Sequence, residues 1–178
     1  MHYKVNFLLD KEISARIRKA TCSFGRLHGR VWNERGIKTS TKVKVYQAVV
    51  LTALLYSCET WVLYRRHLKE LESVHARHLR KILRIKWQDM IQNTEVLRRA
   101  WSTSIEAFLI KAQLRWTGHV LRMEDGRLPK DLLYGELKDG SRHVGGQRKR
   151  FKDTLKRSLT VCNIAIDKLK FTAQDRMQ

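Results

Sequence analysis

The segment DKEISARIRKATCSFGRLHGRVWN, residues 10–33, decides the fold class of this sequence. Its apolar residues recur at alternating spacings of four and three, which places them on one stripe of an α-helix. These residues are Ile13, Ile17, Ala20, Phe24, Leu27 and Val31. Asp10 is expected to be the N-cap of this helix. Gly25 and Gly29 leave two interpretations open, a close approach of another backbone or a weak, broken helix.

The same helical spacing recurs along much of the chain. Further helices are expected at about residues 42–56, 65–86, 94–100 and 103–123. In the first of these, the β-branched pair Val49–Val50 leaves a buried strand as the alternative. The last is expected to begin with a capping box made by Thr103 and Glu106. These patterns predict a mainly α fold.

The composition changes after Asp125. Six residues within 126–146 are glycine or proline, a content typical of turns and loops. Residues 132–137 predict a short strand or an extended arm. Helical spacing then returns in a helix that we expect to begin near Gln147. Its inner face would consist of Phe151, Leu155 and Leu159.

The charge of the chain indicates a polyanionic partner. Among 178 residues, 37 are lysine or arginine and 17 are aspartate or glutamate, so the net charge is +20. We expect RNA and/or DNA as the partner rather than a membrane. The longest nearly apolar run, Ala48–Ser57, has ten residues, whereas a spanning helix needs about 20. The odd count of three cysteines excludes a disulfide scaffold, and we expect an intracellular protein of the nucleus and/or cytoplasm.

Positive charge is most concentrated in residues 142–157, which we call the basic segment. Its seven basic residues are the candidate nucleic-acid contacts: Arg142, Arg148, Lys149, Arg150, Lys152, Lys156 and Arg157. In a helix beginning near Gln147, the three lysines would share an outward strip that follows a phosphate backbone without reading bases. The alternatives are a solvated face or a nuclear-import-like patch. The tryptophans interleaved with basic residues could stack on bases, although Trp61 and Trp116 are expected to belong to the core.

The sequence contains no candidate catalytic centre. It has neither a phosphate-binding glycine loop nor adjacent aspartates or a D-x-D motif that could hold two metal ions. We therefore expect no catalytic residues, no cofactor and no polymerase activity from this chain alone. His75 and His78 lie three residues apart on one helical face, but a closed zinc site needs four ligands. We expect a packed His75, an exposed His78 and no metal site.

Four blocks of the sequence resemble one known family. They are KVKVYQAVVLTALLYSCETW (residues 42–61), HLRKILRIKWQDMIQNTEVL (78–97), LRWTGHVLRMEDGRLPKDLLYGEL (114–137) and GGQRKRFKDTLKRSL (145–159). Their order and spacing resemble the region that follows the palm in LINE-type, non-LTR retrotransposon reverse transcriptases. Family members often carry cysteine where His78 stands and glycine where Ser57 stands.

The resemblance implies a thumb-like helical bundle over residues 1–86, then a second helical region with a Gly-rich basic arm over residues 87–178. In the family, the catalytic aspartates lie upstream in the palm, in a F/Y-x-D-D motif that this sequence lacks. The resemblance therefore implies a non-catalytic fragment that binds template–primer or element RNA. Because the palm is missing, we expect the apolar face of residues 13–31 to be partly orphaned.

Two alternatives to a binding fragment remain open. One is a degenerate mobile-element product with no selected function. The other is a part of an RNA-directed DNA polymerase that regains activity when a palm domain is supplied in trans.

Overall fold

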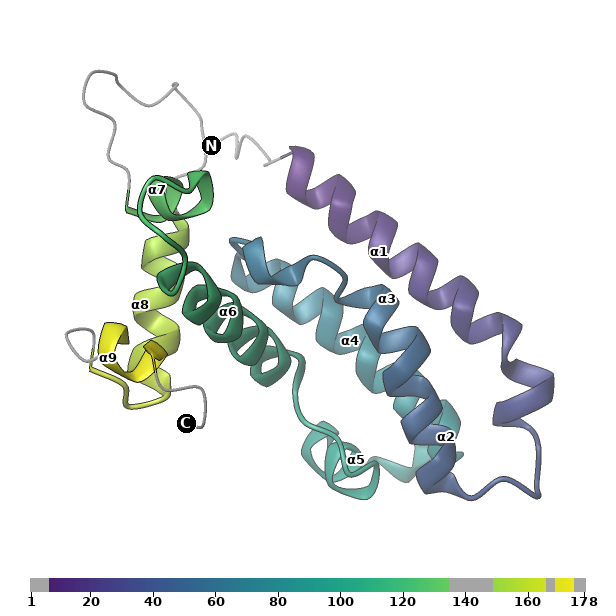
Figure 1. Ribbon diagram of the computed structural model, residues 1–178. Helices are drawn as coiled ribbons and strands as arrows, with labels where there is room; N and C mark the ends of the chain where they lie inside the picture. Colours follow the sequence, from purple (N-terminus) through teal and green to yellow (C-terminus); the bar gives the residue numbers. More distant parts are fainter. Residues whose placement is uncertain (1–6, 135–148, 166–168, 175–178) are drawn as a thin grey trace, which may run out of the picture. The chain divides into compact units, whose positions relative to one another are not determined.

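The computed structural model describes residues 7–134, 149–165 and 169–174, and it confirms the mainly α fold. No strand occurs among these described residues (Figure 1). No described helix combines the length and the apolar character needed to cross a membrane. The chain divides into two compact units. The N-terminal unit consists of Phe7–Ser57 and Leu63–Phe108, and the C-terminal unit contains Cys58–Val62 and the described residues from Leu109 onward. The predicted division at residue 86 stays a prediction.

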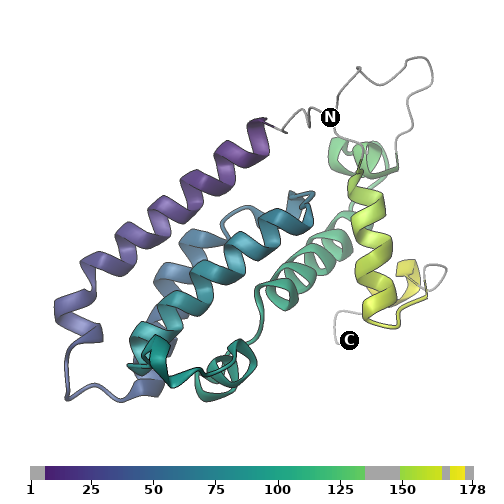
Figure 2. The same cartoon turned by 180° about the vertical axis from the view of Figure 1, so that it is seen from behind.

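The N-terminal unit is a bundle of helices that pack on one another. Its elements are α1 (Phe7–Arg26), a π-helical turn (His28–Trp32), α2 (Thr39–Val45), a second π-helical turn (Tyr46–Leu51), α3 (Thr52–Leu54), α4 (Arg65–Leu83), a short 3₁₀ turn (Trp87–Asp89) and α5 (Asn93–Arg99). Helix α1 contacts α3 and α4, and α4 also contacts α2 and α5 (Figures 1 and 2). The expected helix at 42–56 is therefore confirmed, and the alternative of a buried strand there is wrong.

The apolar face of α1 is covered within its own unit. Ile13, Ala20 and Phe24 are buried, while Ile17 and Val31 are half-buried. The prediction that this face is partly orphaned is therefore wrong for Ile13 and Phe24, because α3, α4 and the turn at 46–51 lie against α1.

The two glycines near the end of α1 face open space. A Cβ atom added at Gly25 or Gly29 would meet no atom within 4 Å among the described residues. A close approach of another segment of the described chain is therefore not the reason for these glycines. The second interpretation, a broken helix, fits better, since α1 ends at Arg26 and a π-helical turn follows.

Asp10 is not the N-cap of α1, because the helix begins three residues earlier, at Phe7. Its carboxylate instead links α1 to α4. Both carboxylate oxygens accept hydrogen bonds from Nη2 of Arg66, at 2.9 and 3.0 Å. The buried ring of His67 contacts the same carboxylate through Nε2. Asp10 therefore stabilises the packing of two helices rather than the end of one.

Ser57 separates α3 from the next segment with a left-handed backbone. Its φ is 64°, a conformation that glycine adopts more readily than any residue with a Cβ atom. A residue with a Cβ atom is therefore strained at this turn.

Helix α6 (Ile105–Leu121) begins in the N-terminal unit and continues in the C-terminal unit. The N-cap residue that the sequence predicts for this helix is wrong by one position. The hydroxyl of Ser104, not that of Thr103, accepts the backbone N–H of Ala107 at 3.2 Å. Ser104 satisfies an amide that the first turn leaves without a partner in the helix.

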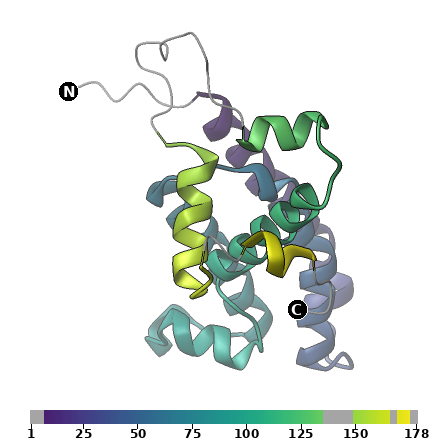
Figure 3. The same cartoon turned by 60° about the vertical axis from the view of Figure 1, so that its left-hand side comes forward.

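The C-terminal unit contains the rest of α6 together with α7 (Leu128–Tyr134), α8 (Phe151–Val161) and α9 (Leu169–Gln174), drawn in green to yellow in Figure 3. Residues 132–134 are helical, so the expected strand or extended arm is wrong there. Pro129 occupies the first turn of α7, where its missing N–H costs no helical hydrogen bond. Residues 135–137 lie outside the described residues. Helix α8 is confirmed, although it begins at Phe151 rather than near Gln147.

Candidate nucleic-acid interface

Helix α8 separates the apolar and basic residues of the basic segment onto different faces. Leu155 and Leu159 are 8% and 2% exposed, whereas Lys156 and Arg157 are exposed to solvent. The half-buried ring of Phe151 meets the ring of Trp116 on α6 nearly at a right angle, with their centroids 5.2 Å apart. The apolar contacts therefore hold α8 in its unit and leave basic side chains at the surface.

The residues around the start of α8 add further positive charge. The backbone N–H of Arg150 donates to the carboxylate of Asp153 at 2.9 Å, so Asp153 caps the first turn. Lys149 and Arg150 precede the helix, and the predicted strip of three lysines on one helical face is therefore wrong for Lys149. Lys152 and Lys156 do lie one turn apart on α8. Arg142 and Arg148 lie outside the described residues.

The charge of the basic segment is concentrated in three dimensions as well as in sequence. The pKa of Lys149 is lowered, first by burial and then by the positive charge of Arg157, against the opposing effect of Asp153. Lys149, which precedes the helix, is thus close enough to Arg157 in its second turn for the two charges to interact. Asp153 is the one acidic residue in the sequence of the basic segment, against seven cations, and this excess of positive charge suits a polyanion.

A cavity lies beside the start of α8, within the C-terminal unit. Its volume is about 480 Å³, within the range of about 300–1,000 Å³ typical of ligand pockets. The lining residues are Thr60, Trp116, Leu128, Pro129, Leu133, Arg150, Phe151 and Lys152. The two cations were predictable from the sequence, whereas the cavity was not, because its walls come from segments far apart in the chain.

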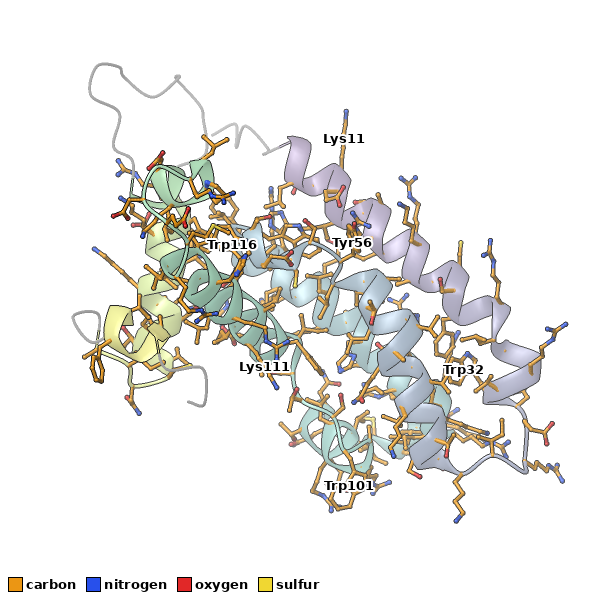
Figure 4. The ribbon with its side chains drawn as sticks, viewed as in Figure 1. Lys11, Trp32, Tyr56, Trp101, Lys111 and Trp116 are labelled. Atoms are coloured by element: carbon orange, nitrogen blue, oxygen red, sulfur yellow. The ribbon has the colours of Figure 1, made fainter. Side chains whose placement is uncertain are left out.

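The tryptophans divide between core and surface. Trp32 and Trp61 are 3% and 5% exposed, whereas Trp87 and Trp101 are 78% and 90% exposed. The core assignment is confirmed for Trp61. Trp116 is half-buried, and it lines the cavity as well as contacting Phe151. Figure 4 shows Trp116 on α6 and Trp101 at the end of α5.

The histidine pair of α4 belongs to the core. His75 Nδ1 forms a 2.8 Å hydrogen bond with the hydroxyl of Tyr46, and its Nε2 lies 3.3 Å from the carbonyl oxygen of Thr103. The expected exposure of His78 is wrong, since its ring is 3% exposed and stacks on Phe24 with centroids 4.3 Å apart. It is buried because several helices pack around α4.

Burial holds both histidines in the neutral form. It lowers the pKa of His75 to about 4, against a smaller opposing effect of the hydrogen bond to Thr103. It also lowers the pKa of His78 to about 4, assisted by the charges of Lys81, Arg77 and His75. Within the part of the chain that the structure describes, no three metal-ligating side chains are grouped so that they could hold an ion.

The chain is similar in sequence to a transposon-derived protein. An uncharacterized transposon-derived protein of Caenorhabditis elegans is 24% identical to it over 123 residues. This similarity indicates a transposon origin. The alignment covers 67% of this chain and 44% of the nematode protein, so the chain spans less than half of that relative's length. No family model and no solved structure matches the chain.

Proposed function

We propose that the chain binds nucleic acid through the basic segment, as a non-catalytic product of a mobile element. The observation that carries this proposal is the division of α8, which buries Leu155 and Leu159 and exposes Lys156 and Arg157. Arg150 and Lys152 continue the positive charge around the first turn. Cations fixed on a helix neutralise phosphates and release counterions, which is the main source of affinity in sequence-tolerant binding.

The parent protein, on this proposal, is a LINE-type retrotransposon reverse transcriptase. Support comes from the four blocks that resemble this family and from the transposon origin of the nematode relative. The helical bundle of residues 7–86 would correspond to the thumb, and the later helices to the C-terminal region. RNA or DNA of the element would be the natural ligand, and the chain would act in the nucleus and/or cytoplasm.

A titration of fluorescent single-stranded RNA and DNA with the full chain tests this proposal. The test variant carries Arg150→Ala, Lys152→Ala, Lys156→Ala and Arg157→Ala. The charge-matched control carries alanine at four exposed lysines of the N-terminal unit, Lys19, Lys44, Lys69 and Lys81. We expect the test variant to weaken binding to every sequence by a similar factor, and the control to weaken it much less. Equal losses in the two variants would mean that only the net charge matters.

A further inference from the structure

The cavity beside α8 combines two features that the proposed function does not use together. Its walls are mostly apolar and include the rings of Trp116 and Phe151, while Arg150 and Lys152 line it as well. The two rings contact each other edge to face, at 83°, and both residues line the cavity. We propose that this cavity receives an unpaired base of a single-stranded nucleic acid.

The chemistry of the lining favours a nucleotide over other occupants. A base offers a flat apolar face for stacking on aromatic rings, and the phosphates joined to it would lie near cations. Arg150 is exposed and Lys152 half-buried, and both belong to the basic segment that continues with Lys156 and Arg157. Charge complementarity and the aromatic lining therefore favour a polyanion that carries planar groups as the occupant of the cavity.

The accessibility of the cavity supports entry from solvent. Leu128 is 69% exposed although it lines the cavity, and Thr60 is exposed as well. A base in a duplex is stacked and paired, so its faces are not available to these rings. The inference rests on the proposed function and adds a preference for single strands over duplexes.

An abasic strand separates this inference from the proposed function. The full chain is titrated with a single-stranded oligonucleotide and with a strand of the same length that has the same phosphates and sugars but lacks bases. Stacking of one base contributes about 1–3 kcal/mol, so we expect roughly 5- to 150-fold weaker binding of the abasic strand. A duplex of the same length should also bind more weakly than the single strand per phosphate.

Two variants locate the base preference. Phe151→Leu removes one of the two rings of the cavity and keeps most of the apolar volume, so it should reduce the preference for the base-containing strand over the abasic strand, while Trp116 retains part of it. Trp101→Ala removes a ring that is 90% exposed and belongs to the other unit, so it should leave the preference unchanged. Circular dichroism checks that both variants fold.

Each other outcome overturns the inference. The unmodified chain could bind the two strands equally while the variant with four alanines in the basic segment binds both more weakly. That result would retain the proposed function and show that the cavity receives no base. A preference of unchanged size in Phe151→Leu would place stacking outside the cavity. Absence of binding to any strand would remove the proposed function as well.

Discussion

Phe151 and Trp116 meet edge to face, with their ring centroids 5.2 Å apart and their planes at 83°. Phe151 is the first residue of α8, and Trp116 lies in α6. Together with buried Leu155 and Leu159, this contact sets which face of α8 is turned inward. Arg150 and Lys152 are the neighbours of Phe151 in the chain, so the same contact also constrains where their backbones lie. An apolar contact thereby determines where the basic segment presents its charge.

Lys42 should contribute to stability in a way that its neighbour Lys44 does not. Lys42 is 4% exposed, and its Nζ donates to the carbonyl oxygens of Trp32 at 2.8 Å and Glu34 at 2.6 Å. Lys42→Met leaves both carbonyls without this charged donor, so we expect the free energy of unfolding to fall by about 1.5–3 kcal/mol. Urea denaturation measures it. The exposed control, Lys44→Met, should change it by less than about 0.5 kcal/mol, and equal effects would contradict the role of Lys42.

Trp101 should be replaceable by glycine with a gain in stability. Its φ is 50°, and it follows α5 in a turn closed by hydrogen bonds from its own N–H to Arg98 and from Ser102 N–H to Leu97. This pattern is a Schellman motif, in which glycine is the usual residue. Trp101→Gly relieves the left-handed strain and should raise the free energy of unfolding by about 0.5–1 kcal/mol. Trp101→Ala keeps the strain, so a gain of the same size in both variants would point to another cause.

His78 should make the chain less stable in mild acid. Its pKa and that of His75 lie at about 4 in the folded chain, whereas an unfolded histidine has a pKa of about 6.5. Between these values the unfolded chain binds more protons, so the free energy of unfolding falls as the pH falls from about 6.5 to about 4. The loss at pH 4 amounts to about 3 kcal/mol for each histidine. Denaturation series across this pH range measure it.

Phenylalanine variants separate the two histidines. Nδ1 of His78 is buried and has no hydrogen-bond partner among the described residues. His78→Phe can therefore keep the stack on Phe24 and lose part of the pH dependence with little cost at pH 7. His75→Phe also loses part of the pH dependence. It should destabilise the chain at pH 7, because the hydroxyl of Tyr46 then lacks its partner. A pH dependence unchanged in both variants would show that other groups control the acid response.

The helices could be predicted from the sequence because their signal is local. The stripe that begins at Ile13 repeats over several turns, and long periodic patterns of this kind distinguish helix from strand. The run at 132–134 is too short for its period to decide, and the structure makes it helical. The burial of Lys42 and His78 could not be predicted from the sequence pattern, because burial depends on which helices pack around these residues.

The residue composition of the candidate interface could be predicted from the sequence, but its three-dimensional shape could not. The cations of the basic segment are visible in the sequence, as are the apolar positions of α8. The cavity is not, because Thr60, Trp116 and Leu133 reach it from three separate segments. Helix α8 begins at Phe151, after Arg150, whose backbone N–H donates to the carboxylate of Asp153. A start at Phe151 rather than near Gln147 leaves Lys149 outside the helix.

The salt dependence of oligonucleotide binding tests the basic segment most directly. Affinities for one single strand are measured between about 50 and 200 mM salt, for the unmodified chain and for the variant with alanine at Arg150, Lys152, Lys156 and Arg157. Each phosphate contact on a single strand adds about 0.7 to the slope of log K against log salt. We expect the slope of the variant to be shallower by roughly 2 to 3, for every sequence tested. An unchanged slope in a folded variant would contradict the assignment of nucleic-acid binding to this segment.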